Sequence, residues 1–170
     1  VGPDGIVFYS EDKQNFEGRI RSLDPASPTP RDFLTGLNRP THLAIDSFGR
    51  LHATTADGVI LVSADRDGGT IVDDVRQADA AAFDEQDNLY LLSAAGGVTR
   101  MSPGGDRSSV DQLADAGITM PVGIAVGTAA RLLVLDRGRG QADGRVIELA
   151  PSGSAQVMTA GLVNPVALAL

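Results

Sequence analysis

The chain lacks residues on which several kinds of functional site depend. Its 170 residues include no cysteine and no tryptophan, and the aromatic content is only 4%. Without cysteine there is no disulfide framework, no thiol nucleophile and no thiolate metal site. Platforms on which a sugar ring stacks need aromatic side chains and are correspondingly scarce. We also expect no bound cofactor.

Clustered positive charge and long apolar runs are also missing. The formal net charge is -8, and the 14 basic residues are scattered along the chain. Such a chain repels a polyanion, so we expect no nucleic-acid partner. No apolar run approaches the roughly 20 residues that cross a bilayer, so we expect no membrane span. The length is that of a single domain, which we place over residues 1–170.

A repeated phrase is the strongest positive feature of the sequence. Four segments superpose at intervals of roughly 40 residues, namely "PTHLAID" (40–46), "ADAAAFD" (78–84), "PVGIAVG" (121–127) and "PVALAL" (165–170). After the first three come a turn, a second apolar run, a third run that begins at glycine, and a polar turn before a fourth run. This order predicts a four-stranded meander in each repeat, the blade of a β-propeller.

The pattern "P-x-x-[LI]-A-[IV]-D-x-x-G-x-L", followed by "G-[RV]-[IV]", resembles the NHL repeat and the related gluconolactonase-like and streptogramin-lyase-like propellers. The resemblance implies an all-β propeller of four-stranded antiparallel blades. The expected repeats cover residues 161–170 together with 1–35, then 36–75, 76–117 and 118–160. Residues 162–170 match a first strand that the first repeat lacks, which predicts a closed four-bladed ring. The alternative is part of a larger ring, such as one of six blades, which oligomerisation would complete.

Two long loops indicate where a ligand binds. The loop between second and third strands is short at 55–58 and 93–97 but long at 10–18 and 136–144. Function is concentrated on such loops, so we expect a binding rim there. Its predicted residues are Arg39, His42, Asp12, Lys13, Asn15, Asp136, Arg137 and Arg139. The planar guanidinium groups of the rim arginines suit a carboxylate or phosphate ligand. The alternative is that their acidic neighbours Glu11, Asp12 and Asp136 neutralise them within the rim.

Metal binding receives little support. The resemblance to lactonase-like propellers implies metal ligands just after the first-strand proline, where this chain has Thr41, Asp79, Val122 and Val166. One carboxylate does not enclose a hard cation. We therefore expect no metal and keep Asp79 as a weak candidate. The segment 63–74, "SADRDGGTIVDD", resembles a calcium loop but lacks its first Asp and final Glu, so we interpret it as a hairpin turn.

Two classes of function remain. One is a non-catalytic binding or scaffold module whose rim meets a protein or a small molecule. The alternative is a channel enzyme, either a lactonase-like hydrolase or a streptogramin-lyase-like lyase. The residues name no acid and base pair, and we interpret His42 and His52 as structural. These considerations favour the binding module. The resemblance to extracytoplasmic modules implies an extracellular or periplasmic location, with a cytoplasmic one as the alternative.

Overall fold

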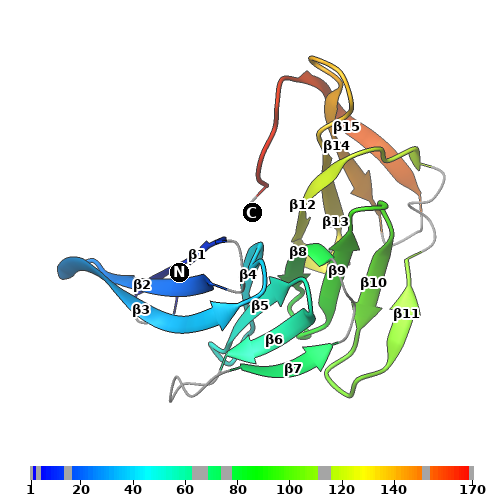
Figure 1. Ribbon diagram of the computed structural model, residues 1–170. Coiled ribbons are helices and arrows are strands. Elements are labelled where there is room, and N and C mark those ends of the chain that lie inside the picture. The colour runs from blue at the N-terminus through cyan, green and yellow to red at the C-terminus, as the bar shows by residue number, and fades with distance from the viewer. Residues whose placement is uncertain are drawn as a thin grey trace. The chain divides into compact units, whose positions relative to one another are not determined.

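The computed structural model describes residues 2, 5–13, 17–62, 69–73, 78–110, 116–150 and 154–168. Over these residues the chain is built from β-strands, with no α-helix. The strands form four antiparallel meander sheets, seen in sequence as the colour runs from blue to red in Figure 1. No helix within the described ranges has the length and apolar character needed to cross a membrane.

The chain divides into two compact units, Val1–Ala78 and Asp79–Leu170. Unit 1 holds a sheet of three strands and a sheet of four. Their strands are β1 (Val7–Glu11), β2 (Gly18–Asp24) and β3 (Ser27–Leu37), then β4 (His42–Ile45), β5 (Leu51–Thr55), β6 (Gly58–Val62) and β7 (Gly69–Asp73).

Unit 2 holds two sheets of four strands. The first contains β8 (Ala78–Phe83), β9 (Leu89–Ser93), β10 (Val98–Met101) and β11 (Arg107–Ser109). The second contains β12 (Pro121–Val126), β13 (Leu132–Asp136), β14 (Gly144–Leu149) and β15 (Ala155–Leu162). These sheets match the meanders that the repeat predicts.

Each unit has its own apolar core, supplied by alternate residues of its sheets. In unit 1 the core gathers Ile20, Leu34, Leu51, Ala53, Ile60 and Val62. In unit 2 it gathers Ala80, Tyr90, Leu92, Val98, Ile124, Leu132, Val134, Ile147 and Leu149. Side chains in a strand point to alternate faces, so the apolar positions of one strand meet those of the facing sheet.

An aspartate closes the turn between the first and second strands of two sheets. Asp46 Oδ1 accepts the backbone N–H of Phe48 at 3.1 Å and of Arg50 at 2.8 Å. Asp84 Oδ1 does the same for Gln86 at 3.0 Å and Asn88 at 2.8 Å. An aspartate side chain commonly stabilises a turn in this way. The Asp of the repeated pattern is therefore a turn residue.

The corresponding turn of the last sheet is built differently. Gly127 takes the place of the aspartate and precedes the short 3-10 turn Thr128–Ala130. Ala130 has φ 57°, and the residues at the matching position of the other turns, Gly49 and Asp87, have φ 77° and 58°. The third residue of the turn is thus left-handed in all three sheets, which explains the glycine of the repeated pattern.

In two blades the glycine that begins the third strand lies against a proline. A Cβ added at Gly18 would be 2.4 Å from Cδ of Pro40, and one at Gly144 would be 2.8 Å from Cδ of Pro165. Real Cβ atoms do not come this close to a neighbour, so only glycine fits at either position. In these two blades the glycine and the proline of the repeat therefore pack against each other.

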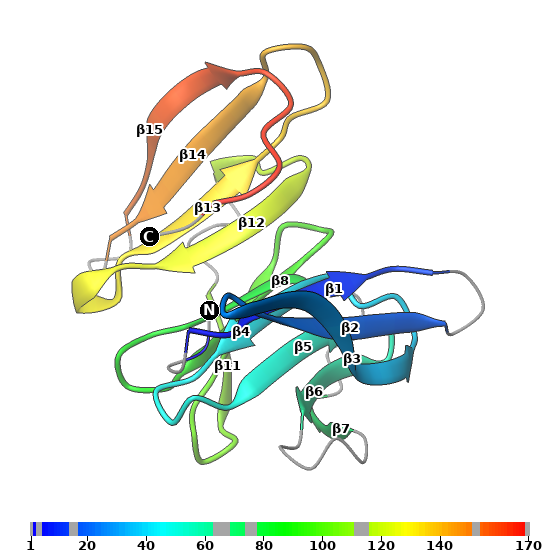
Figure 2. The same ribbon diagram turned by 90° about the vertical axis from the view of Figure 1, so that its left-hand side faces the viewer.

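The end of the chain differs from the predicted strand over 165–170. Residues 165–168 form no strand, and a Cβ at Gly123 of β12 would be 3.3 Å from the backbone nitrogen of Leu168. Figure 2 shows this red segment returning along the sheet that contains β12. Among the described residues, the sheet of β1, β2 and β3 has no fourth strand. Closure of that blade into a four-bladed ring stays a prediction.

Candidate functional site

Two hollows among the described residues of unit 2 lie at opposite ends of its strands. One, here called the rim hollow, has a volume of about 410 Å³ and is lined by Thr119, Asp136, Gly138, Arg139, Asp143 and Arg145. The other, here called the groove, has a volume of about 580 Å³ and is lined by Asp84, Gln86, Asn88, Tyr90, Arg100, Ser109, Val110, Ala130, Leu132, Leu149 and Ala150. The rim hollow lies at the long loop 136–144, and the groove lies at the turns that join first to second strands.

Asp136 holds the rim loop in place. Its carboxylate is buried and accepts the backbone N–H of Met120 at 2.7 Å and of Gly138 at 3.3 Å. It also accepts from the guanidinium of Arg145 at 3.1 Å. Burial alone would raise the pKa of Asp136, but these donors, with the backbone N–H of Thr119, lower it below 3.8. The carboxylate is thus fully engaged within the protein and is not presented to a ligand.

The two arginines predicted for this rim have different surroundings. The Nε of Arg137 donates to the backbone oxygen of Pro165 at 3.3 Å, so its side chain bridges to the end of the chain. Arg139 is exposed and lines the rim hollow. Within the described ranges it makes no ion pair. Arg139 is therefore the member of this group whose charge faces solvent.

The other predicted rim residues belong to unit 1. Arg39 is exposed with φ 49°, and Asp12 and Lys13 are exposed just after β1. His42 is partly buried on β4, where burial lowers its pKa below 6.5. Asn15 lies outside the described residues. The predicted acidic neighbour Glu11 accepts a hydrogen bond from Nε of Arg19 at 2.6 Å instead of neutralising a rim arginine.

The second histidine and the metal candidate have ordinary places in the sheets. His52 is buried, and its Nε2 is 3.2 Å from Oδ2 of Asp46. Asp79 is partly buried on β8. Among the described residues, no three His, Cys, Asp or Glu side chains gather where they would hold a metal ion. Ser63, Asp65, Asp67, Gly68 and Asp74 of the calcium-like segment lie outside the described residues.

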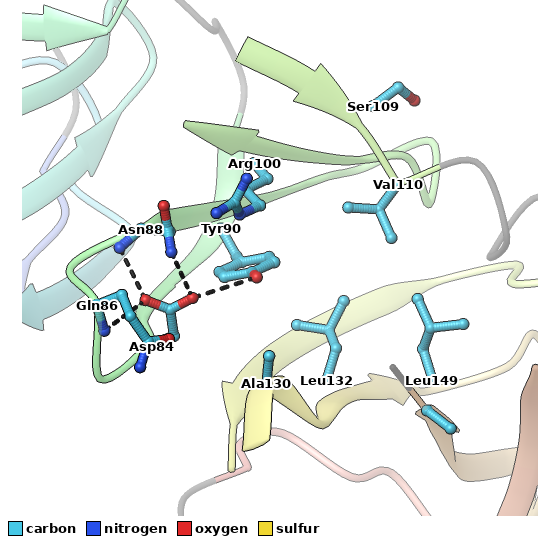
Figure 3. Close-up of a pocket in the computed structure, with 11 residues that line it drawn as sticks. Asp84, Gln86, Asn88, Tyr90, Arg100, Ser109, Val110, Ala130, Leu132 and Leu149 are labelled. Carbon is cyan, nitrogen blue, oxygen red and sulfur yellow. Dashed lines mark hydrogen bonds between the residues drawn. The ribbon is translucent and has the colours of Figure 1, made fainter. Parts of the chain in front are cut away.

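The polar wall of the groove begins at the Asp84 turn. Oδ2 of Asp84 accepts from the side-chain amide of Asn88 at 2.7 Å and from the hydroxyl of Tyr90 at 3.3 Å. Arg100 stands directly opposite Tyr90 in the pairing of β9 with β10. Figure 3 shows the guanidinium of Arg100 beside the Tyr90 ring. The turn and these two strands together place a phenol and a cation at the groove.

The opposite wall of the groove is apolar. It consists of Leu132 and Leu149 from the last sheet and Ala130 from the turn before β13, and Val110, which follows β11, adds an apolar side chain from the sheet of Tyr90. In Figure 3 the side chains of Leu132 and Leu149 stand across the opening from Tyr90 and Arg100. Sequence reasoning did not find this site. A signal was present, since Arg100 falls at the repeat position where the second sheet has Leu61.

Three solved structures show the fold of the chain. A streptogramin B lyase is 13% identical with TM-score 0.61, and the match covers 89% of this chain and 58% of the lyase. A protein assigned to the gluconolactonases is 14% identical with TM-score 0.68, and the match covers 92% of this chain and 60% of that protein. The PQQ-bound aldose sugar dehydrogenase of Streptomyces coelicolor is 16% identical with TM-score 0.59, and the match covers 86% of this chain and 59% of the dehydrogenase.

All three are β-propeller proteins, and the predicted propeller fold is confirmed. The chain spans about three fifths of the length of each of these structures. No model of a known protein family matches the chain. No curated protein matches it either. Identities of this size establish the architecture alone.

Proposed function

We propose that the chain is a non-catalytic binding module, a β-propeller that presents the rim loop 136–144 to a protein or a small molecule bearing a carboxylate. The observation that carries the proposal is the contrast between Asp136 and Arg139. Asp136 is buried and saturated by donors, whereas Arg139 is exposed at the rim hollow and has no ion-pair partner among the described residues. A fixed loop that leaves one cation exposed is a surface suited to an anionic group.

The rim loop is held in shape before any partner arrives. The backbone N–H of Gly140 donates to Oδ2 of Asp143 at 2.7 Å. Gly138 has φ 73°, and a Cβ there would be 2.3 Å from Cβ of Asp143. Ordering of a loop costs free energy on binding, and a preformed loop avoids that cost. The loop around Arg139 therefore offers its partner a binding surface that is already rigid.

Citrate serves as a probe of the rim because it carries three carboxylates and no apolar body. Titration of citrate, followed by amide chemical shifts in NMR, is expected to move the resonances of Gly138, Arg139 and Gly140. Arg139→Ala is expected to abolish those shifts, whereas Arg31→Ala, which removes an exposed arginine from β3, leaves them unchanged. Equal shifts in the parent and in Arg139→Ala would contradict the rim assignment.

The second candidate is a channel enzyme, which the likeness to a streptogramin lyase and a gluconolactonase favours. It predicts that the chain accelerates opening of D-glucono-1,5-lactone above the spontaneous rate in a pH-indicator assay, with and without added Ca²⁺. The binding-module proposal predicts no acceleration. Turnover that grows in proportion to protein concentration would overturn the non-catalytic assignment.

A further inference from the structure

The groove in unit 2 is lined by an arginine, Arg100, that has no ion-pair partner among the described residues. The nearby carboxylate of Asp84 is buried and receives four hydrogen bonds, from the backbone N–H groups of Gln86 and Asn88, the Asn88 amide and the Tyr90 hydroxyl. These four donors are neutral, so Asp84 keeps its negative charge, but they occupy its oxygens and leave it little acceptor capacity for a ligand. Arg100 is therefore the charged donor that the groove offers to a ligand.

Tyr90 stays a neutral hydrogen-bonding group beside Arg100. Burial, reinforced by the charge of Asp84, raises the pKa of Tyr90 above 10.0 although Arg100 opposes the shift. Its hydroxyl proton is directed to Asp84, so the phenol oxygen retains acceptor capacity towards Arg100. The aromatic ring, the guanidinium and the buried aspartate thus form a connected arrangement along β9 and β10.

The facing wall offers apolar surface in place of further charge. Leu132 and Leu149 line the groove with little exposed surface, and Val110 and Ala130 add further apolar lining. Figure 3 shows this apolar wall across from the polar one. The volume of about 580 Å³ is in the range of small-molecule sites, which are mostly apolar with a few polar groups that fix orientation.

We propose that the groove binds a small organic anion, a carboxylate joined to an aromatic or branched apolar body. The carboxylate accepts paired hydrogen bonds from Arg100, a geometry that suits a guanidinium. The apolar body lies against Leu132 and Leu149. An inorganic anion would leave this wall exposed to water, and a neutral apolar molecule would leave Arg100 without a counter-ion. The two walls together select a molecule with both features.

The probe for this proposal is 4-phenylbutyrate, with 4-phenylbutyramide as its uncharged counterpart of the same shape. Methyl resonances of Leu132, Leu149 and Val110 are followed by NMR, and affinity is measured by calorimetry. We expect 4-phenylbutyrate to shift these methyls and the amide to bind at least tenfold more weakly, because a hydrogen bond to a charged group is lost.

Variants separate this site from the rim. Arg100→Gln keeps a polar side chain and is expected to weaken 4-phenylbutyrate binding at least tenfold, with the melting temperature measured alongside to establish folding. Arg139→Ala leaves 4-phenylbutyrate binding unchanged, while Arg100→Gln leaves the citrate response of the rim unchanged. The groove proposal and the rim proposal therefore fail independently of each other.

Four results would overturn the groove proposal. The first is equal affinity of 4-phenylbutyrate and its amide for the parent protein. The second is unchanged affinity in a folded Arg100→Gln protein. The third is a response to 4-phenylbutyrate confined to the amides of Gly138 and Gly140, which would place the anion at the rim. Absence of any binding at millimolar 4-phenylbutyrate also counts against the site.

Discussion

Two turns on either side of the groove occupy the same place in successive repeats and are held by different means. In the turn 84–88, the Asp84 carboxylate accepts two backbone N–H groups and two side-chain donors. In the turn 127–131, Gly127 offers no side chain, and Arg131 pairs instead with Glu148 of β14. Both turns are closed by a backbone hydrogen bond, from Asp84 N–H to the Asn88 oxygen at 3.1 Å and from Gly127 N–H to the Arg131 oxygen at 2.7 Å. The first turn adds side-chain bonds within itself, whereas the second adds an ion pair to a neighbouring strand.

The difference has a consequence for the groove. The Asp84 turn fixes Tyr90 through the phenol hydroxyl and so determines the polar wall. The Gly127 turn brings Ala130 and the start of β13, which are part of the apolar wall. The change from aspartate to glycine between the repeats therefore coincides with a change from polar to apolar lining. A residue change between equivalent turns, like a change in loop length, therefore alters whether a site is polar or apolar.

The largest expected effect comes from removing the turn aspartate. Asp84→Ala leaves the buried Asn88 N–H and the Tyr90 hydroxyl without their acceptor, which is expected to lower the free energy of unfolding by about 2 to 3 kcal/mol. Urea denaturation measures the change. Asp143→Ala removes one hydrogen bond at an exposed position and serves as control, with an expected loss below about 1 kcal/mol. Similar losses in both variants would show that the turn aspartate has no special role.

Asp46 closes a third turn at the same place in its repeat, and the pKa of its carboxylate makes the contribution of this turn to stability depend on pH. Burial would raise the pKa of Asp46, but Arg50, through its backbone and side chain, and His52 lower it below 3.8. A depressed pKa means that the folded state favours the carboxylate. Its contribution is therefore complete above the unfolded pKa and disappears as the pH falls through the folded value.

Asp46→Asn is accordingly expected to destabilise the protein at pH 7 by about 1 to 2 kcal/mol, with the difference from the parent shrinking towards pH 2. Urea unfolding at intervals between pH 7 and pH 2 tests this. The exposed Asp106→Asn, which removes the same charge, provides the reference. Parallel curves for Asp46→Asn and the parent over the whole range would refute the expectation.

The smallest expected effect is a gain in the free energy of unfolding, from a substitution in the turn 127–131, which lacks an aspartate. Ala130 has φ 57°, a left-handed conformation in which its Cβ is strained. Ala130→Gly is expected to raise the free energy of unfolding by about 0.5 to 1 kcal/mol, because relief of strain exceeds the extra chain entropy. Gly49→Ala at the matching position should act in the opposite direction. A melting temperature lowered by Ala130→Gly would indicate that the turn rearranges.

The sequence was sufficient to predict the propeller blades because their signals are local and periodic. Pro40, Asp46 and Gly49 mark one turn and strand start, and the same spacing returns at Asp84 and Asp87. The long loop 136–144 was likewise visible as extra length. The sequence did not reveal that Asp136, the last residue of β13 before this loop, is buried, because a charged residue beside a loop carries no signal of which donors surround it.

The groove could be found only from the tertiary structure. Leu132 and Leu149 read as ordinary core residues, and Arg100 as one more exposed arginine. They become a site because two sheets of unit 2 diverge at the ends where Tyr90 and Leu132 lie. The amino-acid pattern by itself determined strands, turns and repeat length, since these follow from local backbone preference and the alternation of side chains. The tertiary structure decided which charges are satisfied within the protein and which, like Arg100 and Arg139, face a hollow.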